Sequence, residues 1–381
     1  MKRFFAAALF FVLLLSLLPC AVQAADLDVP AKSAVLMDVA TGTVLYEQNS
    51  HTALPPASVT KVMTMLLIME AIDSGRVAWE DMVTTSETAA AKGGSQIFLK
   101  VGETMSVADM VKSIAVSSAN DCACAMAEHI AGSEKAFVDL MNQRAKELGM
   151  QDTNFVNCTG LDDGEDAKSH KTSAYDIGLM SRELLKNHPD IKKYTTIWMD
   201  TVRDGAFGLS NTNKLVRFYK GATGLKTGFT SSAGYCLSAS AERDGMELIA
   251  VTMGSETSPL RFSACKSMLD YGFANYAVVS PELPESADVQ VKLGIAETVK
   301  AVPGADSTLL IDKGQKSQVQ TETELEPFVT APVSKGQRLG TMRITSSGQV
   351  LAEIPLLAEA SVDKVSWGQL FLRALRMLAL G

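Results

Sequence analysis

Ser58 and Lys61 stand three residues apart at the start of a nearly uncharged run, 55–72. A serine hydroxyl becomes a strong nucleophile only when a base removes its proton, and side chains at positions i and i+3 of a helix lie on one face within reach of each other. Pro55 and Pro56 stand just ahead of the run, as is common where a helix begins. The spacing predicts a nucleophile, Ser58, with Lys61 as its base.

The residues that follow explain how a lysine could act as a base. The run 62–69 is apolar on all sides, which predicts a helix buried through the centre of a domain. Burial and nearby positive charge favour the neutral form of Lys61, which a base must have. The free N–H groups at the start of such a helix would also favour a developing oxyanion.

Two further motifs distinguish Ser58 from chance matches. The Ser-x-x-Lys pattern alone is weak evidence, because 263–266 and 361–364 match it as well. Ser118-Ala119-Asn120 lies 60 residues after Ser58, in an expected turn between two helices, and Lys226-Thr227-Gly228 lies 108 residues further on, on an expected glycine-rich strand. Neither pattern occurs elsewhere in the chain, so the three motifs together form a specific signal.

With these motifs the sequence resembles the penicilloyl-serine enzymes, and among them the low-molecular-mass penicillin-binding proteins that act as D-alanyl-D-alanine carboxypeptidases. The resemblance extends over nearly the whole chain beyond its first residues, and it includes the segments 94–99 and 221–228. It implies an α+β class: a β-lactamase-like transpeptidase domain with an antiparallel sheet and a helical region, then a small all-β domain and a C-terminal amphipathic helix.

The resemblance also implies a role for each residue of the first two motifs. Ser58 is expected to attack the carbonyl between two terminal D-alanines and to form an acyl-enzyme, with Lys61 as the base. Ser118 is expected to relay a proton to the leaving D-alanine, because a hydroxyl can both give and accept a proton. Asn120 is expected to hold the substrate amide and to orient Lys61.

The substrate-binding residues implied by the resemblance follow the second motif. Lys226 is expected to supply fixed positive charge beside the terminal carboxylate of the substrate, Thr227 to bind that carboxylate, and Arg261 to complete the anion site. Gly228 leaves room for substrate to lie against its strand. The backbone N–H groups of the nucleophile and of Phe229 are the expected oxyanion hole. Water then releases the acyl group, and no metal or organic cofactor is implied.

The start of the chain predicts export. Lys2 and Arg3 precede an apolar stretch, 4–18, and small residues near Ala24, so 1–24 is interpreted as a cleaved secretory signal. A lipid anchor on Cys20 is disfavoured because Pro19 precedes it. The expected location is the outer face of the bacterial cytoplasmic membrane.

Hydrophobic patterns divide the remainder into a catalytic domain, 25–276, a β-rich domain, 277–358, and an amphipathic, membrane-anchoring tail, 359–381. In the catalytic domain they predict a sheet closed by both ends of the domain, with helices between. Its expected elements are strands at 33–38, 44–47, 221–229, 234–241 and 246–253, a helical region over 58–185 and a helix over 260–273. In the β-rich domain the expected strands are 289–293, 307–311, 318–325, 338–344 and 350–354.

The tail has a helical pattern over 362–380. Trp367 and Phe371 lie on its apolar side, and Arg373 and Arg376 on the other, which predicts a helix lying in the membrane interface rather than spanning it. The alternative is a helix docked on the β-rich domain.

Charge and composition narrow the partners. The net charge of −8 becomes −10 when Lys2 and Arg3 leave with the signal, so nucleic acid is not an expected partner. The expected partners are peptidoglycan pentapeptide stems, β-lactam antibiotics as inhibitors, and a membrane surface. Beyond Cys20 an odd number of cysteines remains, which predicts buried thiols rather than a disulfide framework. The four histidines follow no ligand spacing and are interpreted as surface or helix-packing residues.

Three rival functions share the motifs. A class A β-lactamase carries a glutamate with an asparagine four residues later, whereas here Ser169 follows Glu165 at that spacing, and Ala119 replaces the middle aspartate of its second motif. A β-lactam sensor is acylated but turns over nothing, and the intact motifs favour an enzyme over it. An endopeptidase that cuts cross-links needs the same site chemistry.

Overall fold

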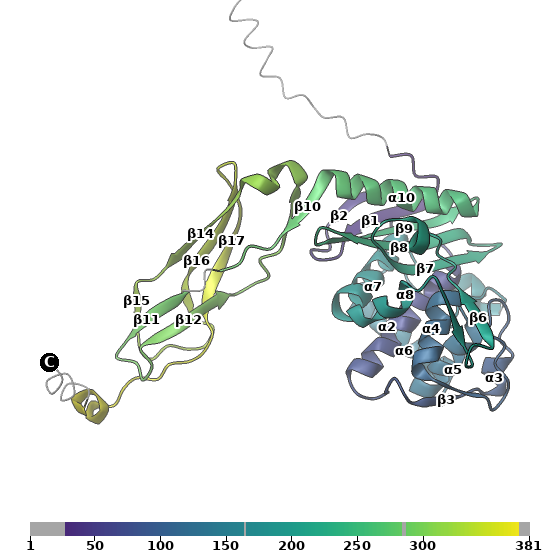
Figure 1. Ribbon diagram of the computed structural model, residues 1–381, viewed down its shortest axis with the longest axis horizontal. Coiled ribbons are helices and arrows are strands. Elements are labelled where there is room, and N and C mark those ends of the chain that lie inside the picture. The colour runs from purple at the N-terminus through teal and green to yellow at the C-terminus, as the bar shows by residue number, and fades with distance from the viewer. Residues whose placement is uncertain (1–26, 164, 284–286, 373–381) are drawn as a thin grey trace, which may run out of the picture.

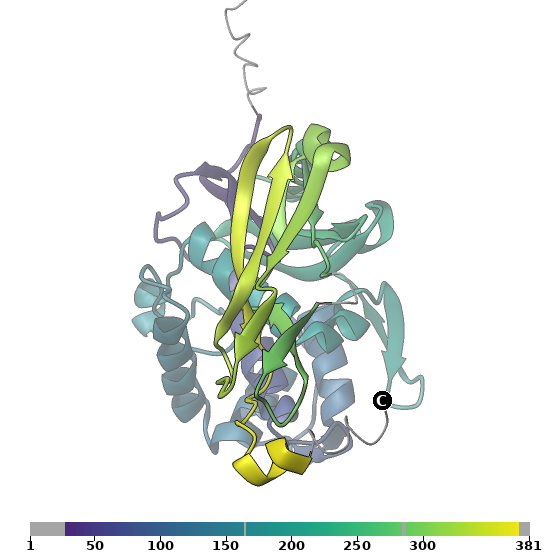
Figure 2. The same cartoon turned by 90° about the vertical axis from the view of Figure 1, so that its left-hand side faces the viewer.

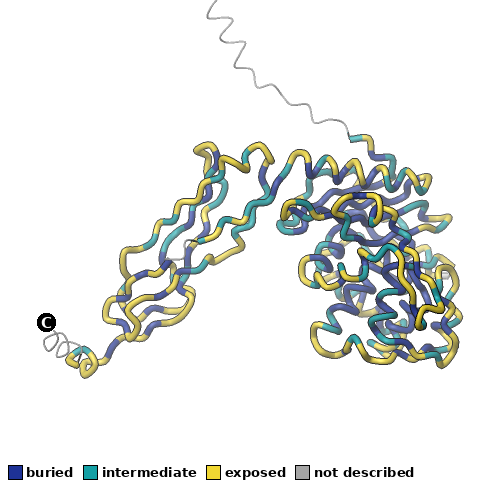
Figure 3. The backbone as a smooth tube through the Cα atoms, viewed as in Figure 1, coloured by how far each residue is buried: buried dark blue, intermediate teal, exposed yellow. Residues whose placement is uncertain are grey.

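The computed structural model describes residues 27–163, 165–283 and 287–372, so the expected signal at 1–24 and the end of the tail lie outside the described residues. The described chain forms two bodies, an α+β domain and a slender all-β domain that extends away from it (Figures 1 and 2). The α+β domain is buried throughout its interior, whereas buried and exposed residues alternate along the strands of the second domain (Figure 3). The predicted class and order of the two domains are confirmed.

A five-stranded antiparallel sheet organises the first domain. Its order is β2 (Val44–Gln48), β1 (Ser33–Asp38), β9 (Met246–Ser255), β8 (Gly234–Arg243) and β7 (Ala222–Thr230). The first strand of the domain therefore pairs with a late one, as predicted for a sheet closed by both ends. The turn between β8 and β9 has positive φ at both Asp244 and Gly245, the combination that matches the twist of a tight hairpin.

Side chains alternate across this sheet and build one core on each face. Val35 and Val251 belong to the core on the helical side, whereas Leu36 and Leu248 belong to the core under α10 (Ser258–Asn275). The helix α10 packs closely enough that a Cβ at its Gly272 would lie 2.4 Å from a methyl carbon of Leu248. Figure 1 shows α10 on one face of the sheet and, on the other, α2 (Lys61–Asp73), α4 (Val107–Ser117), α5 (Asn120–Ala131), α6 (Glu134–Glu147) and α7 (Ala174–Asn187).

The helical region surrounds one central helix, α2 (Lys61–Asp73), in which nearly every residue is buried. Each large apolar side chain removed from water contributes about 1.5–3 kcal/mol, so α2 is held by packing rather than by caps. It packs against α4, α5, α6 and α7. The short helices α3 (Glu87–Ala90), α8 (Lys192–Thr195) and α9 (Leu215–Phe218) pack on α5, on α4 and β7, and on β7, respectively. Two small two-stranded sheets were not predicted: β3 (Met82–Thr84) with β4 (Thr104–Ser106), and β5 (Met199–Val202) with β6 (Phe207–Ser210).

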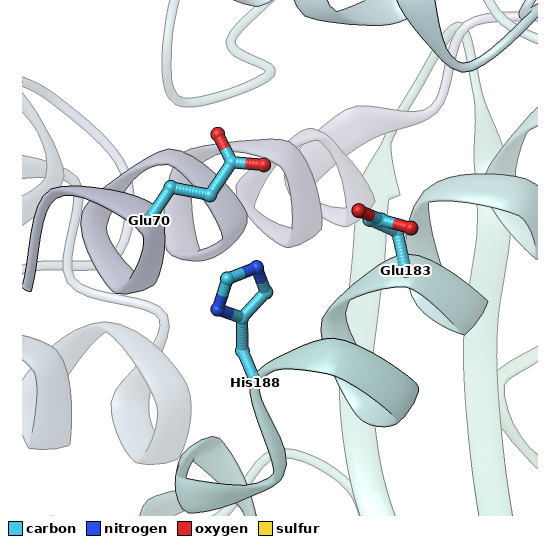
Figure 4. Close-up of side chains that lie close together, drawn as sticks. All are labelled: Glu70, Glu183 and His188. Carbon is cyan, nitrogen blue, oxygen red and sulfur yellow. The ribbon is translucent and has the colours of Figure 1, made fainter. Parts of the chain in front are cut away.

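Arg144 ties three helices together. Its Nε donates to Glu70 of α2 at 2.7 Å and its Nη2 donates to Glu183 of α7 at 2.6 Å. The same two carboxylates lie near His188, with ligand atoms within 4.8 Å of one another, so the trio has the composition of a metal site (Figure 4). Because the Arg144 guanidinium already binds both carboxylates, we interpret the cluster as an ion-pair network.

The second domain begins where β10 (Tyr276–Val279) leaves α10 and pairs with β13 (Leu309–Asp312). Its six-stranded sheet has the order β14 (Val319–Leu325), β16 (Arg338–Ser346), β17 (Gln349–Ala358), β12 (Thr298–Pro303), β11 (Asp288–Lys292) and β15 (Phe328–Thr330). The strands β12 and β15 were not predicted. In β12 only the alternation of buried Val299 and Ala301 with polar residues marks the strand, and the flanking turn residues dilute that short signal.

The helix of the tail begins later than the expected position 362. Val362 pairs with Val333 and Lys364 with Gly294, so this stretch completes the β-rich domain, and the helix starts at Trp367. On its described part, 367–372, the large apolar side chains of Trp367 and Phe371 are exposed. No helix within the described ranges is long and apolar enough to cross a membrane.

Candidate active site

Ser58 lies on a short 3-10 turn, η1 (Ala57–Thr60), directly before α2. Its Oγ is 3.0 Å from the Nζ of Lys61, the first residue of α2. The predicted contact is therefore present, and the 3-10 turn favours it because three residues per turn place i and i+3 in line. The Lys61 ammonium nitrogen has a second partner, the carbonyl oxygen of Thr159, at 2.8 Å.

Lys61 is fully buried, and burial lowers the pKa of its ammonium to about 7. The neighbouring Cys158 and Asp121 act in the opposite direction but do not compensate for the lost hydration. A large fraction of Lys61 is therefore neutral near pH 7, where an ordinary lysine is almost fully charged. This is the state that a general base for Ser58 requires.

The second motif occupies the junction between α4 and α5. Ser118 has a left-handed backbone (φ 63°), and its buried Oγ has no hydrogen-bond partner among the described residues. The Nδ2 of Asn120 donates to the carbonyl of Gly93 at 2.7 Å, while its Oδ1 is buried and equally unpartnered within the described chain. Unpaired buried polar atoms are costly, so these two atoms are suited to pairing with a ligand.

Asp121 follows the motif and holds the segment opposite it. Its carboxylate accepts N–H bonds from Ile97 at 3.1 Å and Leu99 at 3.0 Å, and the N–H of Asn120 donates to Ser95 at 2.7 Å. The segment 93–99 is thereby fixed against the start of α5. Asp121 was not predicted as a site residue, because an aspartate near a helix start is ordinarily an exposed cap.

The third motif lies on β7. Lys226 is buried, and its Nζ donates to the carbonyl of Thr227 at 2.9 Å. Burial, together with the charges of Lys61 and Arg261, holds the pKa of Lys226 well below its ordinary value. Burial and these neighbouring charges thus disfavour the charged form of Lys226, and an anion beside it would favour that form. The Thr227 hydroxyl donates to Thr212 at 2.7 Å.

Gly228 corrects one expectation. A Cβ here would lie 2.6 Å from the carbonyl oxygen of Pro56 and 3.0 Å from the amide nitrogen of Ser58. The space that glycine leaves is thus filled by the nucleophile's own turn rather than kept for substrate. The next residue, Phe229, is half exposed and stacks on Tyr235, with ring centroids 4.3 Å apart.

Arg261 reaches the same strand from α10. Its Nη1 donates to the carbonyl of Gly228 at 2.8 Å and to that of Cys236 at 3.3 Å, and its guanidinium lies over the ring of Tyr235. The Nε is buried without a partner in the described part of the chain. Arg261 is therefore adjacent to the third motif, as predicted. Its Nη1 binds the backbone of β7 and β8 and so is not free for substrate.

His170 and Thr60 were missed. The interpretation of all four histidines as surface or helix-packing residues is wrong for His170, which is buried behind the nucleophile's turn, with its Nε2 2.8 Å from Thr60 Oγ1. A single histidine in a polar loop gives no periodic signal, so its partner could not be inferred from the sequence. The described cysteines are all free and buried, as predicted.

A cavity of about 460 Å³ adjoins the serine site. It lies between the segment 88–93 and residues of 156–163 and 166–167, and both Gly93 and Thr159 belong to its lining. Its lining includes Lys92, Asn157, Leu161, Asp163 and Asp166. The site thus combines the Ser58–Lys61 pair, the junction between α4 and α5, and two further basic side chains, Lys226 on β7 and Arg261 on α10. These parts lie close enough that Asp121 affects the pKa of Lys61, and Lys61 that of Lys226.

Comparisons with known proteins agree with this chemistry. A family model described as D-alanyl-D-alanine carboxypeptidase matches residues 20–257, and one described as penicillin-binding protein 5, C-terminal domain, matches residues 281–364. The chain is 43% identical to D-alanyl-D-alanine carboxypeptidase DacF of Bacillus subtilis, over 96% of each chain. It is 34% identical to DacC of Escherichia coli, over 88% of this chain and 85% of the relative.

Solved structures give the same result. Penicillin binding protein 5 from Haemophilus influenzae is similar with a TM-score of 0.74 and 32% identity, over 88% of this chain and 98% of that one. Penicillin-binding protein D2 from Listeria monocytogenes, in its ampicillin-bound form, is similar with a TM-score of 0.59 and 33% identity, over 65% of this chain and 99% of that one.

Proposed function

This chain belongs to the D-alanyl-D-alanine carboxypeptidase family, and from that premise we propose that its serine site removes the terminal D-alanine from peptidoglycan pentapeptide stems. The observation that carries the proposal is the 3.0 Å contact between Ser58 Oγ and the Nζ of a lysine whose pKa is lowered to about 7.

Acylation begins with neutral Lys61, which takes the proton of Ser58 Oγ as this oxygen attacks the carbonyl between the two D-alanines. The resulting oxyanion accepts hydrogen bonds from the backbone N–H groups of Ser58 and Phe229. Gly228 supports this arrangement because its missing Cβ lets β7 approach the nucleophile's turn. Stabilisation of the oxyanion by such fixed donors contributes about 2.7–4 kcal/mol per donor in related chemistry.

Ser118 and Asn120 act on the leaving group and the substrate backbone. The C–N bond breaks as the D-alanine nitrogen receives a proton through the Ser118 hydroxyl. The Oδ1 of Asn120 accepts from the substrate amide. Both roles are supported by the same fact: Ser118 Oγ and Asn120 Oδ1 are buried and have no partner within the described residues.

The terminal carboxylate is bound by Lys226, Thr227 and Arg261. Burial and repulsion by the neighbouring charges of Lys61 and Arg261 lower the pKa of Lys226. A substrate carboxylate would relieve that repulsion, so the site favours a peptide with a free C-terminus. This selects a carboxypeptidase substrate over an internal peptide bond.

The decisive experiment is D-alanine release from a pentapeptide that ends in D-Ala-D-Ala, with labelled penicillin to report acylation and Ser58→Ala as the matched control. Release by the parent and none by Ser58→Ala supports the proposal. Labelling of Ser58 without release would refute it and leave a β-lactam sensor. Penicillin hydrolysis at a rate far above D-alanine release would favour a β-lactamase instead.

The family acts on peptidoglycan, and structures of Listeria monocytogenes penicillin-binding protein D2 contain ampicillin or cefotaxime. We extend β-lactam acylation to Ser58 of this chain, since a β-lactam has the carboxylate and strained amide that the site would accept. Mass spectrometry of the intact protein after penicillin treatment tests this. An adduct that persists in Ser58→Ala would contradict it.

Export and membrane anchoring complete the proposal. The family is periplasmic or cell-wall associated, which agrees with the signal expected at 1–24. Trp367 and Phe371 support the anchor because both are exposed on the described start of the terminal helix. Sedimentation with phosphatidylglycerol vesicles should recover the parent and lose the variant Trp367→Ser/Phe371→Ser, and equal recovery of both would refute anchoring through this helix.

A further inference from the structure

Behind the nucleophile's turn, two buried side chains form a directed chain of hydrogen bonds. The N–H of Val156 donates to Nδ1 of His170 at 3.1 Å, so this nitrogen carries no proton. The proton must then be on Nε2, which donates to Thr60 Oγ1 at 2.8 Å. The Thr60 hydroxyl in turn donates to the carbonyl of Ala57 at 2.8 Å.

The last acceptor in this chain is the residue immediately before Ser58. Ala57 has φ of +48°, in the left-handed region, where a residue with a Cβ costs about 1–2 kcal/mol. Its carbonyl is closed in from the other side by Gly160, where a Cβ would lie only 1.8 Å from the oxygen. The strained backbone that orients Ser58 is thus held by Thr60 on one side and by the 156–161 segment on the other.

The imidazole is suited to a fixed, neutral role. Burial and the nearby charge of Lys61 lower the pKa of His170 to about 4, so the ring stays neutral at the pH where Lys61 works as a base. Protonation would also place an N–H on Nδ1 against the N–H of Val156. The ring of Phe155 packs edge-on against it, with centroids 5.7 Å apart, which restricts its rotation.

The loop that contains Val156 also contacts the base, Lys61. Thr159, three residues after Val156, gives its carbonyl to the Nζ of Lys61 at 2.8 Å. One imidazole therefore bonds on one side to the segment that positions the base, and on the other to the turn that positions the nucleophile. A histidine that served only to fill space would not need a hydrogen-bond partner for each ring nitrogen. In His170 both nitrogens have one, and together these partners fix one tautomer.

We propose that His170 is a positioning residue for acylation. Through Thr60 and Val156 it keeps Ser58 Oγ and Lys61 Nζ at the distance and orientation that proton transfer requires. His170 touches neither substrate nor the reacting atoms and acts only through these neighbours. This role rests on the acylation of Ser58 proposed above. If the positions of Ser58 Oγ and Lys61 Nζ are disturbed, the acylation rate constant of every folded molecule falls, whereas the number of active molecules does not. Small misplacements of reacting groups cost up to about 100-fold in rate.

The matched pair Thr60→Val and Thr60→Ser provides the test, since valine keeps the shape of threonine without its hydroxyl and serine keeps the hydroxyl. The rate constant of labelling with fluorescent penicillin and the final stoichiometry are measured on the full chain, together with His170→Phe. Thr60→Val and His170→Phe are expected to acylate roughly 10- to 100-fold more slowly yet reach one label per molecule. Thr60→Ser is expected to stay within about threefold of the parent.

Each other outcome has a defined meaning. An unchanged rate in Thr60→Val would overturn the inference, and so would reduced stoichiometry with an unchanged rate in the labelled fraction, because that pattern indicates a purely structural role. If His170→Phe does not fold, the Thr60 pair alone decides. Absence of labelling in the parent would refute the proposed function, and the positioning role with it.

Discussion

The backbone of Gly228 lies against the amide nitrogen of Ser58, so closely that a Cβ on Gly228 would stand 3.0 Å from that nitrogen. This joins the strand of the third motif to the nucleophile of the first by direct backbone contact. It also brings the backbone N–H groups of η1 and of β7 close to each other. The proposed oxyanion hole is therefore expected to be sensitive to a side chain at position 228.

Gly228→Ala should lower acylation by penicillin about 100-fold or more, because the added methyl carbon would push β7 away from Pro56 and Ser58. Gly208→Ala is the matched control: Gly208 also lies on a strand, and no atom lies within 4 Å of the position of its Cβ. Stopped-flow labelling measures both. Equal acylation rates for Gly228→Ala and Gly208→Ala would contradict the prediction and show that acylation does not depend on the close approach of β7 to Ser58.

The acidic limb of the pH profile should follow Lys61. Its folded-state pKa is lowered to about 7, and only the neutral amine accepts a proton from Ser58, so acylation should fall about tenfold per pH unit below 7 and level off above it. The pH dependence of kcat/KM for D-alanine release measures this limb. A rate that stays constant down to pH 5 would exclude Lys61 as the base.

Substrate binding should raise the pKa of Lys226. In the free site burial and the charges of Lys61 and Arg261 lower this pKa, and a bound carboxylate offsets those effects. Calorimetry of a D-Ala-D-Ala peptide with Ser58→Ala, in buffers of different ionisation enthalpy near pH 8, should show proton uptake. A peptide with an amidated C-terminus is the control, and equal proton uptake with both peptides would contradict the assignment of Lys226 to the carboxylate.

The Arg144 network should stabilise the domain without taking part in the reaction. Arg144→Met leaves Glu70 and Glu183 without their partner, and because these groups are about one-fifth exposed we expect a loss of roughly 1–3 kcal/mol. Lys135→Met, which removes an exposed ion pair, should change stability by less than about 0.5 kcal/mol. Urea unfolding measures both, with the acylation rate of the folded protein expected to stay unchanged. A similar effect of the two substitutions would show that the network adds no more than a surface pair.

Much of the catalytic domain could be predicted because its signals are local. The spacing of Ser58 and Lys61 fixes their contact within one turn, and the Asp244-Gly245 pair specifies a hairpin by its own backbone preferences. Alternating apolar residues located the main strands. The predictions failed where the signal was short or its partner distant, as in β12, β15 and the stretch 362–365, which pairs with the β-rich domain before the tail helix begins.

The sequence by itself determined the nucleophile, its base and the identity of the three motifs, because residue type and spacing encode contacts within a turn. Only the tertiary structure decided what surrounds them: the approach of Gly228 to Ser58, the support that Arg261 gives to β7, and the burial of His170 behind Thr60. These contacts join residues that are far apart in the chain. They follow from the packing of the sheet, α2 and the segments 156–163 and 165–170 around one another, and no local pattern specifies such packing.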